Sequence, residues 1–184
     1  MHQKLKDSPG IYIVGFMGCG KTTIGQELAK QLGWSFVDLD DEVESRAGKS
    51  ISEVFEQDGE PAFRTIETEC LREQTRMVRM GRAQVVGLGG GTFVAADNRE
   101  LIDEAGVSIW LDAPAEALWE RVKAKTHRPL AQDKDAFLQR HADRSAAYSK
   151  AHFQMDATQA PETIVEAIRE LISPMQRAQR LTRD

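Results

Sequence analysis

The sequence predicts an α/β protein in which helices cover both faces of a parallel sheet. Short apolar runs alternate with longer amphipathic stretches along the chain, and strands that alternate with helices typically build a parallel sheet. A glycine-rich segment, residues 15–20, lies between the first apolar run and the first amphipathic stretch. At 184 residues the chain has the length of one domain and can bury a hydrophobic core.

The predicted elements follow one another in a regular order. Residues 11–14 form the first strand, and residues 21–32 form the first helix because Ile24, Leu28 and Leu32 would share one face. The other predicted elements are strands at 36–37, 84–88, 107–111 and 153–156, a helix with Ala117, Leu118 and Arg121, and a last helix from Pro161.

Composition narrows the classes of partner. The formal net charge of −5 argues against nucleic acid, which favours a clustered basic surface. Residues 1–9 lack the apolar core of a signal peptide, and no apolar run approaches the roughly 20 residues of a membrane span. Cys19 and Cys70 are far apart and match no metal-binding spacing. We therefore expect a cytoplasmic protein with neither nucleic acid nor a membrane as partner. We also expect a monomer, although composition does not decide the oligomeric state.

Residues 15–22 read GFMGCGKT and fit the phosphate-binding pattern G-x-x-x-x-G-K-[ST] in full. Glycines allow backbone N–H groups to turn toward phosphates, and the start of the next helix adds positive potential. Lys21 would reach the β- and γ-phosphates, and Thr22 would bind Mg²⁺. The alternative is a glycine-rich turn with an accidental lysine. The residues predicted to bind ATP here are Gly18, Cys19, Gly20, Lys21, Thr22 and Thr23.

Two carboxylates follow the second predicted strand. Asp38 and Asp40 are two positions apart, so in extended chain both would face the same side. That side would be the carboxyl edge of the sheet, where ligands of such folds bind. One carboxylate could hold Mg²⁺ through water, and the other could orient or deprotonate an acceptor hydroxyl. The alternative is that residues 40–42 form the acidic first turn of a helix.

Arg64 and a run of three glycines complete the candidate acceptor side. Arg64 falls in the first turns of a predicted helix, where a cation is unfavourable and suggests an anionic partner. The alternative is a solvated arginine paired with Glu60 or Glu67. Gly89, Gly90 and Gly91, the glycine triplet, end a strand and permit close approach of a ligand, although a flexible turn would look the same.

The motifs GFMGCGKTT, DLD, GEPAFR-TIE, GGG, HRPL and RSAAY occur in this order, and with them the chain resembles the shikimate kinase family over about residues 10–172. The resemblance implies a three-layer P-loop NTPase fold, similar to nucleoside monophosphate kinases, with five parallel strands in the order 2-3-1-4-5. It also implies transfer of the γ-phosphoryl group of MgATP to the 3-hydroxyl of shikimate, a step toward chorismate and the aromatic amino acids.

The resemblance implies a role for individual residues. Lys21 and Asp40 would be catalytic, with Asp40 as the base that binds the shikimate hydroxyls, and Asp38 would support Mg²⁺ beside Thr22. Arg64 and Arg144 would bind the shikimate carboxylate, with the glycine triplet, and Gly90 above all, against the ring. Arg121 would pack on the adenine, and Arg128 would close over ATP from a lid.

The same resemblance divides the chain, a single kinase domain over 1–184, into parts. These are a helical substrate-binding subdomain at about 41–79, a lid at about 123–134 and a frayed tail at about 175–184. The chain departs from the family pattern at His152, where alanine is frequent, and at Ala131, where leucine is frequent. The alternatives are a gluconate-type kinase, more remotely a nucleoside monophosphate kinase, and a non-enzymatic nucleotide switch.

Overall fold

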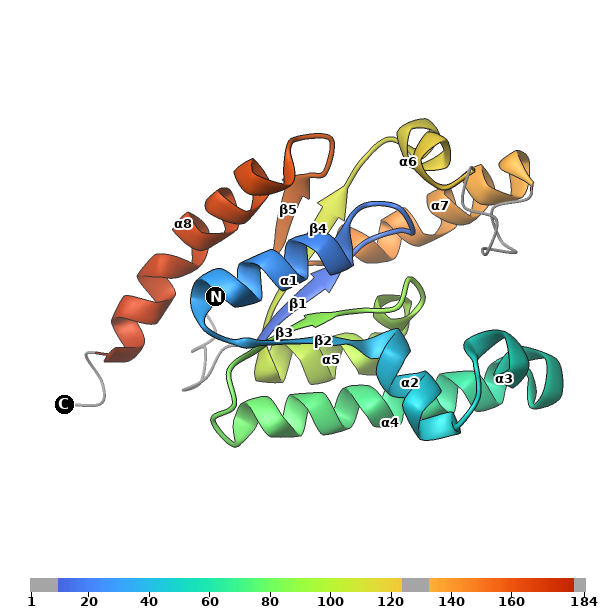
Figure 1. Cartoon of the computed structure of the whole chain (residues 1–184), viewed down its shortest axis with the longest axis horizontal. Helices are drawn as coiled ribbons and strands as arrows, with labels where there is room; N and C mark the ends of the chain where they lie inside the picture. Colours follow the sequence, from blue (N-terminus) through green and yellow to red (C-terminus); the bar gives the residue numbers. More distant parts are fainter. Residues whose placement is uncertain (1–9, 124–132, 181–184) are drawn as a thin grey trace.

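Five parallel strands form one sheet in the order β2-β3-β1-β4-β5. The computed structural model describes residues 10–123 and 133–180, the last six of them as backbone only. The predicted α/β class and strand order are confirmed (Figure 1). The strands are β1 (Gly10–Val14), β2 (Ser35–Asp38), β3 (Gln84–Gly87), β4 (Gly106–Asp112) and β5 (Phe153–Asp156).

Helices cover the sheet on both sides, which gives three layers. Helix α1 packs beside α8 on one face, while α4 packs beside α5 on the other (Figure 1). The helices are α1 (Lys21–Leu32), α2 (Leu39–Ala47), α3 (Ile51–Gln57), α4 (Gly59–Arg79), the 3₁₀ turn η1 (Thr92–Val94), α5 (Ala96–Ala105), α6 (Ala115–Val122), α7 (Lys134–Tyr148) and α8 (Pro161–Arg180).

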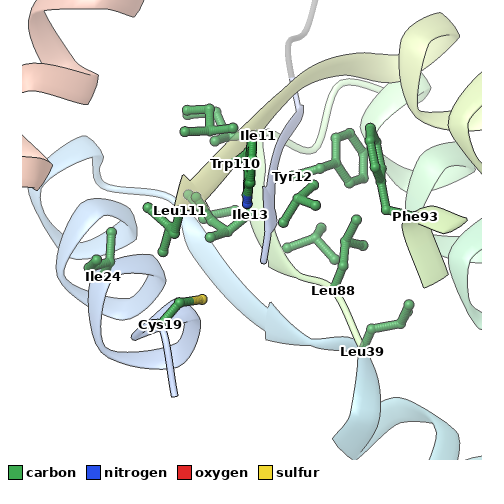
Figure 2. Packing of buried hydrophobic residues seen from close by; sticks show 14 of the residues in the cluster. Ile11, Tyr12, Ile13, Cys19, Ile24, Leu39, Leu88, Phe93, Trp110 and Leu111 are labelled. Atoms are coloured by element: carbon green, nitrogen blue, oxygen red, sulfur yellow. The ribbon is translucent and has the colours of Figure 1, made fainter. Parts of the chain in front are cut away.

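The central strand β1 is apolar on both faces, so helices must cover the sheet on each side. All five of its residues are buried, because β1 pairs with β3 on one side and β4 on the other. Its side chains alternate between the faces: Ile13 points toward α1 with Leu111, while Tyr12 points toward Phe93 (Figure 2). The apolar run of a strand buried on both faces is therefore continuous.

The departure from the family pattern at His152 is accommodated at the β4–β5 pair. The backbone N–H of Ser108 donates to His152 Nδ1 over 3.1 Å, and the backbone N–H of His152 donates to Ser108 Oγ over 3.1 Å. Strand β5 then pairs with β4 in regular parallel register from Phe153 onward. The change of residue therefore leaves the edge strand in place.

Two of the predicted parts, the tail and the lid, are not fully tested by the structure. Helix α8 continues past Pro174 to Arg180, so the predicted frayed tail begins within a helix, and its fraying stays a prediction. The predicted lid falls mainly on 124–132 and, with Arg128, lies outside the described residues. The predicted substrate-binding subdomain, 41–79, corresponds to most of α2 and to α3 and α4.

Candidate active site

The phosphate-binding loop joins β1 to α1 at the carboxyl edge of the sheet. Gly15, Gly18 and Gly20 have φ angles of 150°, 85° and 98°, which favour glycine over residues with a side chain. A Cβ atom on Gly15 would lie 2.7 Å from Cys19 Sγ and 2.8 Å from the Leu111 carbonyl oxygen. Cys19 is 2% exposed, so its side chain fills the inside of the loop.

Lys21 opens α1 and lies across this loop. Its Nζ donates to the carbonyl oxygens of Gly15 at 2.9 Å and Phe16 at 3.4 Å. Both acceptors belong to the loop itself, so the ammonium group is held where phosphates would be cradled. The accidental-lysine alternative gives no reason for this placement. Thr23, in the same first turn, is exposed.

Thr22 and Asp38 place two oxygen atoms that could bind a metal ion beside Lys21. Thr22 Oγ1 donates to Asp38 Oδ2 over 3.0 Å. A hydroxyl and a carboxylate in contact are the hard oxygen ligands that suit Mg²⁺, which otherwise keeps water and phosphate ligands. Among the described residues no group of three His, Cys, Asp or Glu side chains could hold a metal ion.

The extended-chain argument for Asp38 and Asp40 was wrong. The strand ends at Asp38, and α2 begins at Leu39 with Asp38 as its N-cap, so Asp40 lies in the first helical turn. The backbone N–H of Asp40 donates to Asp38 Oδ1 over 3.1 Å. The acidic-first-turn interpretation describes the backbone correctly, yet both carboxylates still lie at the carboxyl edge: Asp38 against α1, and Asp40 against the glycine triplet.

The glycine triplet is the point where three side chains predicted for the acceptor side meet. A Cβ atom on Gly89 would lie 2.6 Å from Asp40 Oδ1, and one on Gly90 would lie 2.9 Å from Arg144 Nη1. A Cβ atom on Gly91 would lie 2.7 Å from Arg64 Nη2. Side chains from α2, α4 and α7 therefore approach one backbone segment closely, and a Cβ atom at any of the three glycines would displace the end of one of them.

Arg64 is oriented by two carboxylates of its own helix. Its Nη1 donates to Glu67 Oε2 over 2.8 Å, while Nε and Nη2 donate to Glu60 Oε1 over 3.2 and 3.0 Å. These contacts use three of the five guanidinium N–H groups and leave two, the number that a bidentate carboxylate needs. Partial burial acts to lower the pKa of Arg64, but Glu67 and Glu60 outweigh it and the pKa is raised.

Glu67 is a site residue that sequence reasoning named only as an alternative partner for Arg64. The residue is 1% exposed, and besides Arg64 its carboxylate accepts a hydrogen bond of 2.6 Å from Thr92 Oγ1. The signal available in the sequence was the three-residue spacing from Arg64, which places both side chains on one helical face. The contact with Thr92 comes from η1, which is distant in sequence.

Arg144 reaches the glycine triplet from α7 together with Tyr148. The Tyr148 hydroxyl donates to the Gly90 carbonyl oxygen. Burial raises the pKa of Tyr148 to about 12, and the nearby Arg144 charge offsets it only in part. The guanidinium of Arg144 also lies 5.6 Å from the centre of the Phe16 ring. No carboxylate in the described part of the chain forms a salt bridge with Arg144.

Similarity to known proteins identifies the family of this chain. The shikimate kinase family model matches residues 17–173. The chain belongs to the shikimate kinase family. A shikimate kinase of Caulobacter vibrioides is 42% identical over 162 residues, which cover 86% of this chain and 79% of that protein. One of Cereibacter sphaeroides is 46% identical over 120 residues, which cover 65% of this chain and 58% of the relative.

Solved structures extend the likeness to three dimensions. A shikimate kinase from Acinetobacter baumannii in complex with shikimate has a TM-score of 0.81 and 36% identity, with 92% of this chain and 96% of that chain covered. A gluconokinase from Sinorhizobium meliloti has a TM-score of 0.61 at 18% identity and covers 96% of both chains, which shows the fold alone. Membership of the shikimate kinase family makes this protein an ATP-dependent kinase that phosphorylates shikimate.

Arg121, assigned to the adenine through the family, bridges two segments of the carboxyl edge. Its Nη2 donates to the Ala157 carbonyl oxygen over 2.9 Å, and its Nη1 to that of Gly18 over 3.4 Å. Gly18 belongs to the phosphate-binding loop, and Ala157 follows β5. Arg121 therefore joins the phosphate-binding loop to the segment that follows β5.

Two further expectations can be compared with the structure. Both cysteines are free and buried. No helix in the described ranges combines the length and the apolar character required to cross a bilayer.

Proposed function

We propose that the carboxyl edge of the sheet binds MgATP on the β1–α1 loop and shikimate against the glycine triplet, and that phosphoryl transfer occurs between them. The observation that carries the proposal is the convergence of Asp40, Arg64 and Arg144 on the glycine triplet. Strands β1 and β3 are neighbours, so the two loops that follow them lie side by side.

Shikimate offers a carboxylate and hydroxyls, and each matches a group in the site. Arg64, with its two remaining N–H groups, and Arg144, which forms no salt bridge to a described carboxylate, would hold the carboxylate through charge-assisted hydrogen bonds. Asp40, against Gly89, would accept the proton of the 3-hydroxyl or orient that hydroxyl for attack on the γ-phosphorus. Gly90 and its neighbours allow the ring to approach the backbone.

On the nucleotide side, Lys21 would neutralise charge on the transferring phosphoryl group, while N–H groups from Gly18 to Thr23 cradle the phosphates. Thr22 and Asp38 would hold magnesium, which, when bound, neutralises charge on the β- and γ-phosphates. Arg121 would contact the base side, and Arg128 would cover ATP from the predicted lid. We further propose a monomer located in the cytoplasm.

An ADP-release assay tests the proposal. The protein is supplied with MgATP and, in separate reactions, shikimate, gluconate or a nucleoside monophosphate, with Lys21→Ala as the matched inactive variant. Of the three acceptors, we expect only shikimate to give turnover with MgATP. Removal of the divalent cation by a chelator should abolish that turnover. Turnover with gluconate that exceeds turnover with shikimate would refute the acceptor assignment.

A further inference from the structure

The turn η1, directly after the glycine triplet, is held from behind by two adjacent side chains of α5. Asn98 Nδ2 donates to the carbonyl oxygen of Thr92 over 3.0 Å. Arg99 Nη1 donates to the carbonyl oxygens of Phe93 and Val94 over 2.9 and 2.6 Å. Three successive backbone acceptors are thus fixed, and Phe93 anchors the turn in the core (Figure 2).

This support continues into the glycine triplet itself. The backbone N–H groups of Thr92 and Val94 donate to the carbonyl oxygens of Gly89 and Gly91, both over 3.1 Å. The triplet has no side chains with which to anchor its own conformation. Its position therefore depends on η1 as well as on the Tyr148 hydroxyl that donates to Gly90, and the position of η1 depends on α5.

Thr92 connects the same support to Arg64. Its side chain is fully buried, and its hydroxyl donates to Glu67 Oε1 over 2.6 Å, while the other oxygen of Glu67 accepts from Arg64 over 2.8 Å. Asn98, 2% exposed, closes the circuit by accepting a 3.1 Å hydrogen bond from Thr68 Oγ1 on α4.

We infer that Thr92 and Asn98 are positioning residues for the acceptor carboxylate. They hold the glycine triplet and the Arg64 guanidinium in one hydrogen-bonded unit. The backbone of the triplet and the N–H groups of Arg64 therefore face the acceptor with preset geometry. Donors fixed before binding lose less freedom when the ligand arrives. The inference rests on the proposed role of Arg64 and adds the residues that aim it.

The test is Thr92→Val, which removes the hydroxyl and keeps the branched shape. We expect KM for shikimate to rise about ten-fold, the effect of one misplaced charged hydrogen bond. KM for ATP should stay at the parent value, and Thr92→Ser, which restores the hydroxyl, should recover most of the loss. Thr75→Val is the matched control, because the hydroxyl of buried Thr75 donates to the Arg72 carbonyl oxygen within its own helix, α4.

A double-mutant cycle separates this inference from the function on which it rests. If Thr92 acts through Arg64, Thr92→Val should add little to the shikimate KM of Arg64→Ala. An Arg64→Ala variant with the KM of the parent would overturn the carboxylate role of Arg64 itself. Where Arg64→Ala weakens binding but Thr92→Val leaves the shikimate KM unchanged, or raises both substrate KM values alike, only the positioning role fails.

Thr68→Val provides the test if Thr92→Val does not fold. Thr68 is half-buried and reaches Arg64 only through Asn98, Thr92 and Glu67, so its loss should raise KM for shikimate only about two- to three-fold, again without a change for ATP. An unchanged shikimate KM in this variant would overturn the inference for Asn98.

Discussion

The two arginines of the acceptor site should respond differently to removal, because their surroundings differ. Arg64→Ala leaves the carboxylate of Glu67, 2% exposed as a side chain, with the Thr92 hydroxyl as its remaining hydrogen-bond partner among the described residues. An unsatisfied buried group costs about 1–3 kcal/mol. Arg64 is 35% exposed, so water replaces part of its contribution and the lower half of that range applies.

Arg144→Ala removes no carboxylate contact within the described residues. The change should cost about 0.5–1 kcal/mol, from the contact with the Phe16 ring at 5.6 Å. For acceptor binding, each arginine should contribute a charge-assisted hydrogen bond of about 1.5–3 kcal/mol. That corresponds to a roughly ten-fold to more than hundred-fold loss of shikimate affinity. Stability should therefore separate the two variants, while affinity should not.

Calorimetric titration with shikimate and with ATP, combined with thermal unfolding, measures both effects. Each kcal/mol should lower the unfolding midpoint by about 2–4 °C in a chain of this size. Lysine at either position should rescue affinity only in part, because it offers a point charge without a fork. The reasoning is refuted if either alanine variant binds shikimate as the parent does, or if Arg144→Ala is the less stable of the two.

Three further changes probe other parts of the molecule. Lys21→Ala should abolish ADP release and leave the unfolding midpoint near that of the parent, since the Lys21 ammonium group donates to two carbonyl oxygens of the loop and lies outside the core; near-normal turnover would contradict the kinase mechanism. Asp40→Asn should abolish most turnover in single-turnover assays with ATP binding retained, whereas survival of activity would reduce Asp40 to a helix-start residue. Tyr12→Phe should raise the free energy of unfolding in urea by about 1 kcal/mol, because the buried hydroxyl has no hydrogen-bond partner among the described residues; a loss of stability would reveal one.

The sheet was predictable from the sequence because its strands are short apolar runs with clear ends. The expected strands at 11–14, 84–88 and 107–111 differ from β1, β3 and β4 by one residue at one or both ends. Periodicity cannot give the order of strands, because pairing such as Ile11 with Val85 joins residues far apart in the chain. That order came from the resemblance to the family.

The site was predictable in its residues but less so in its local geometry. Two-residue spacing places Asp38 and Asp40 on one face only if the chain stays extended, and a helix that begins at Leu39 breaks that condition. An aspartate followed by an acidic turn is also a helix-start signal, and here it was the stronger of two competing patterns. Thr92 and Asn98 were not predicted, because threonine and asparagine are usually surface residues. Nothing in the sequence near them indicates the partners that bury them.

The two interpretations of Arg64 hold together, and their coexistence explains how the site would recognise an anion. Glu60 and Glu67 pair with Arg64, as the surface-arginine alternative expected, yet two guanidinium N–H groups remain. Glu60, Glu67 and Asp40 carry three formal negative charges around the glycine triplet against two positive charges on Arg64 and Arg144, so net charge there gives no attraction for a carboxylate. Selectivity must then come from the directions of the hydrogen bonds. Glu67 orients the Arg64 guanidinium, and Arg144 has no carboxylate partner among the described residues. The glycine triplet has no side chains, so a ligand can approach both arginines.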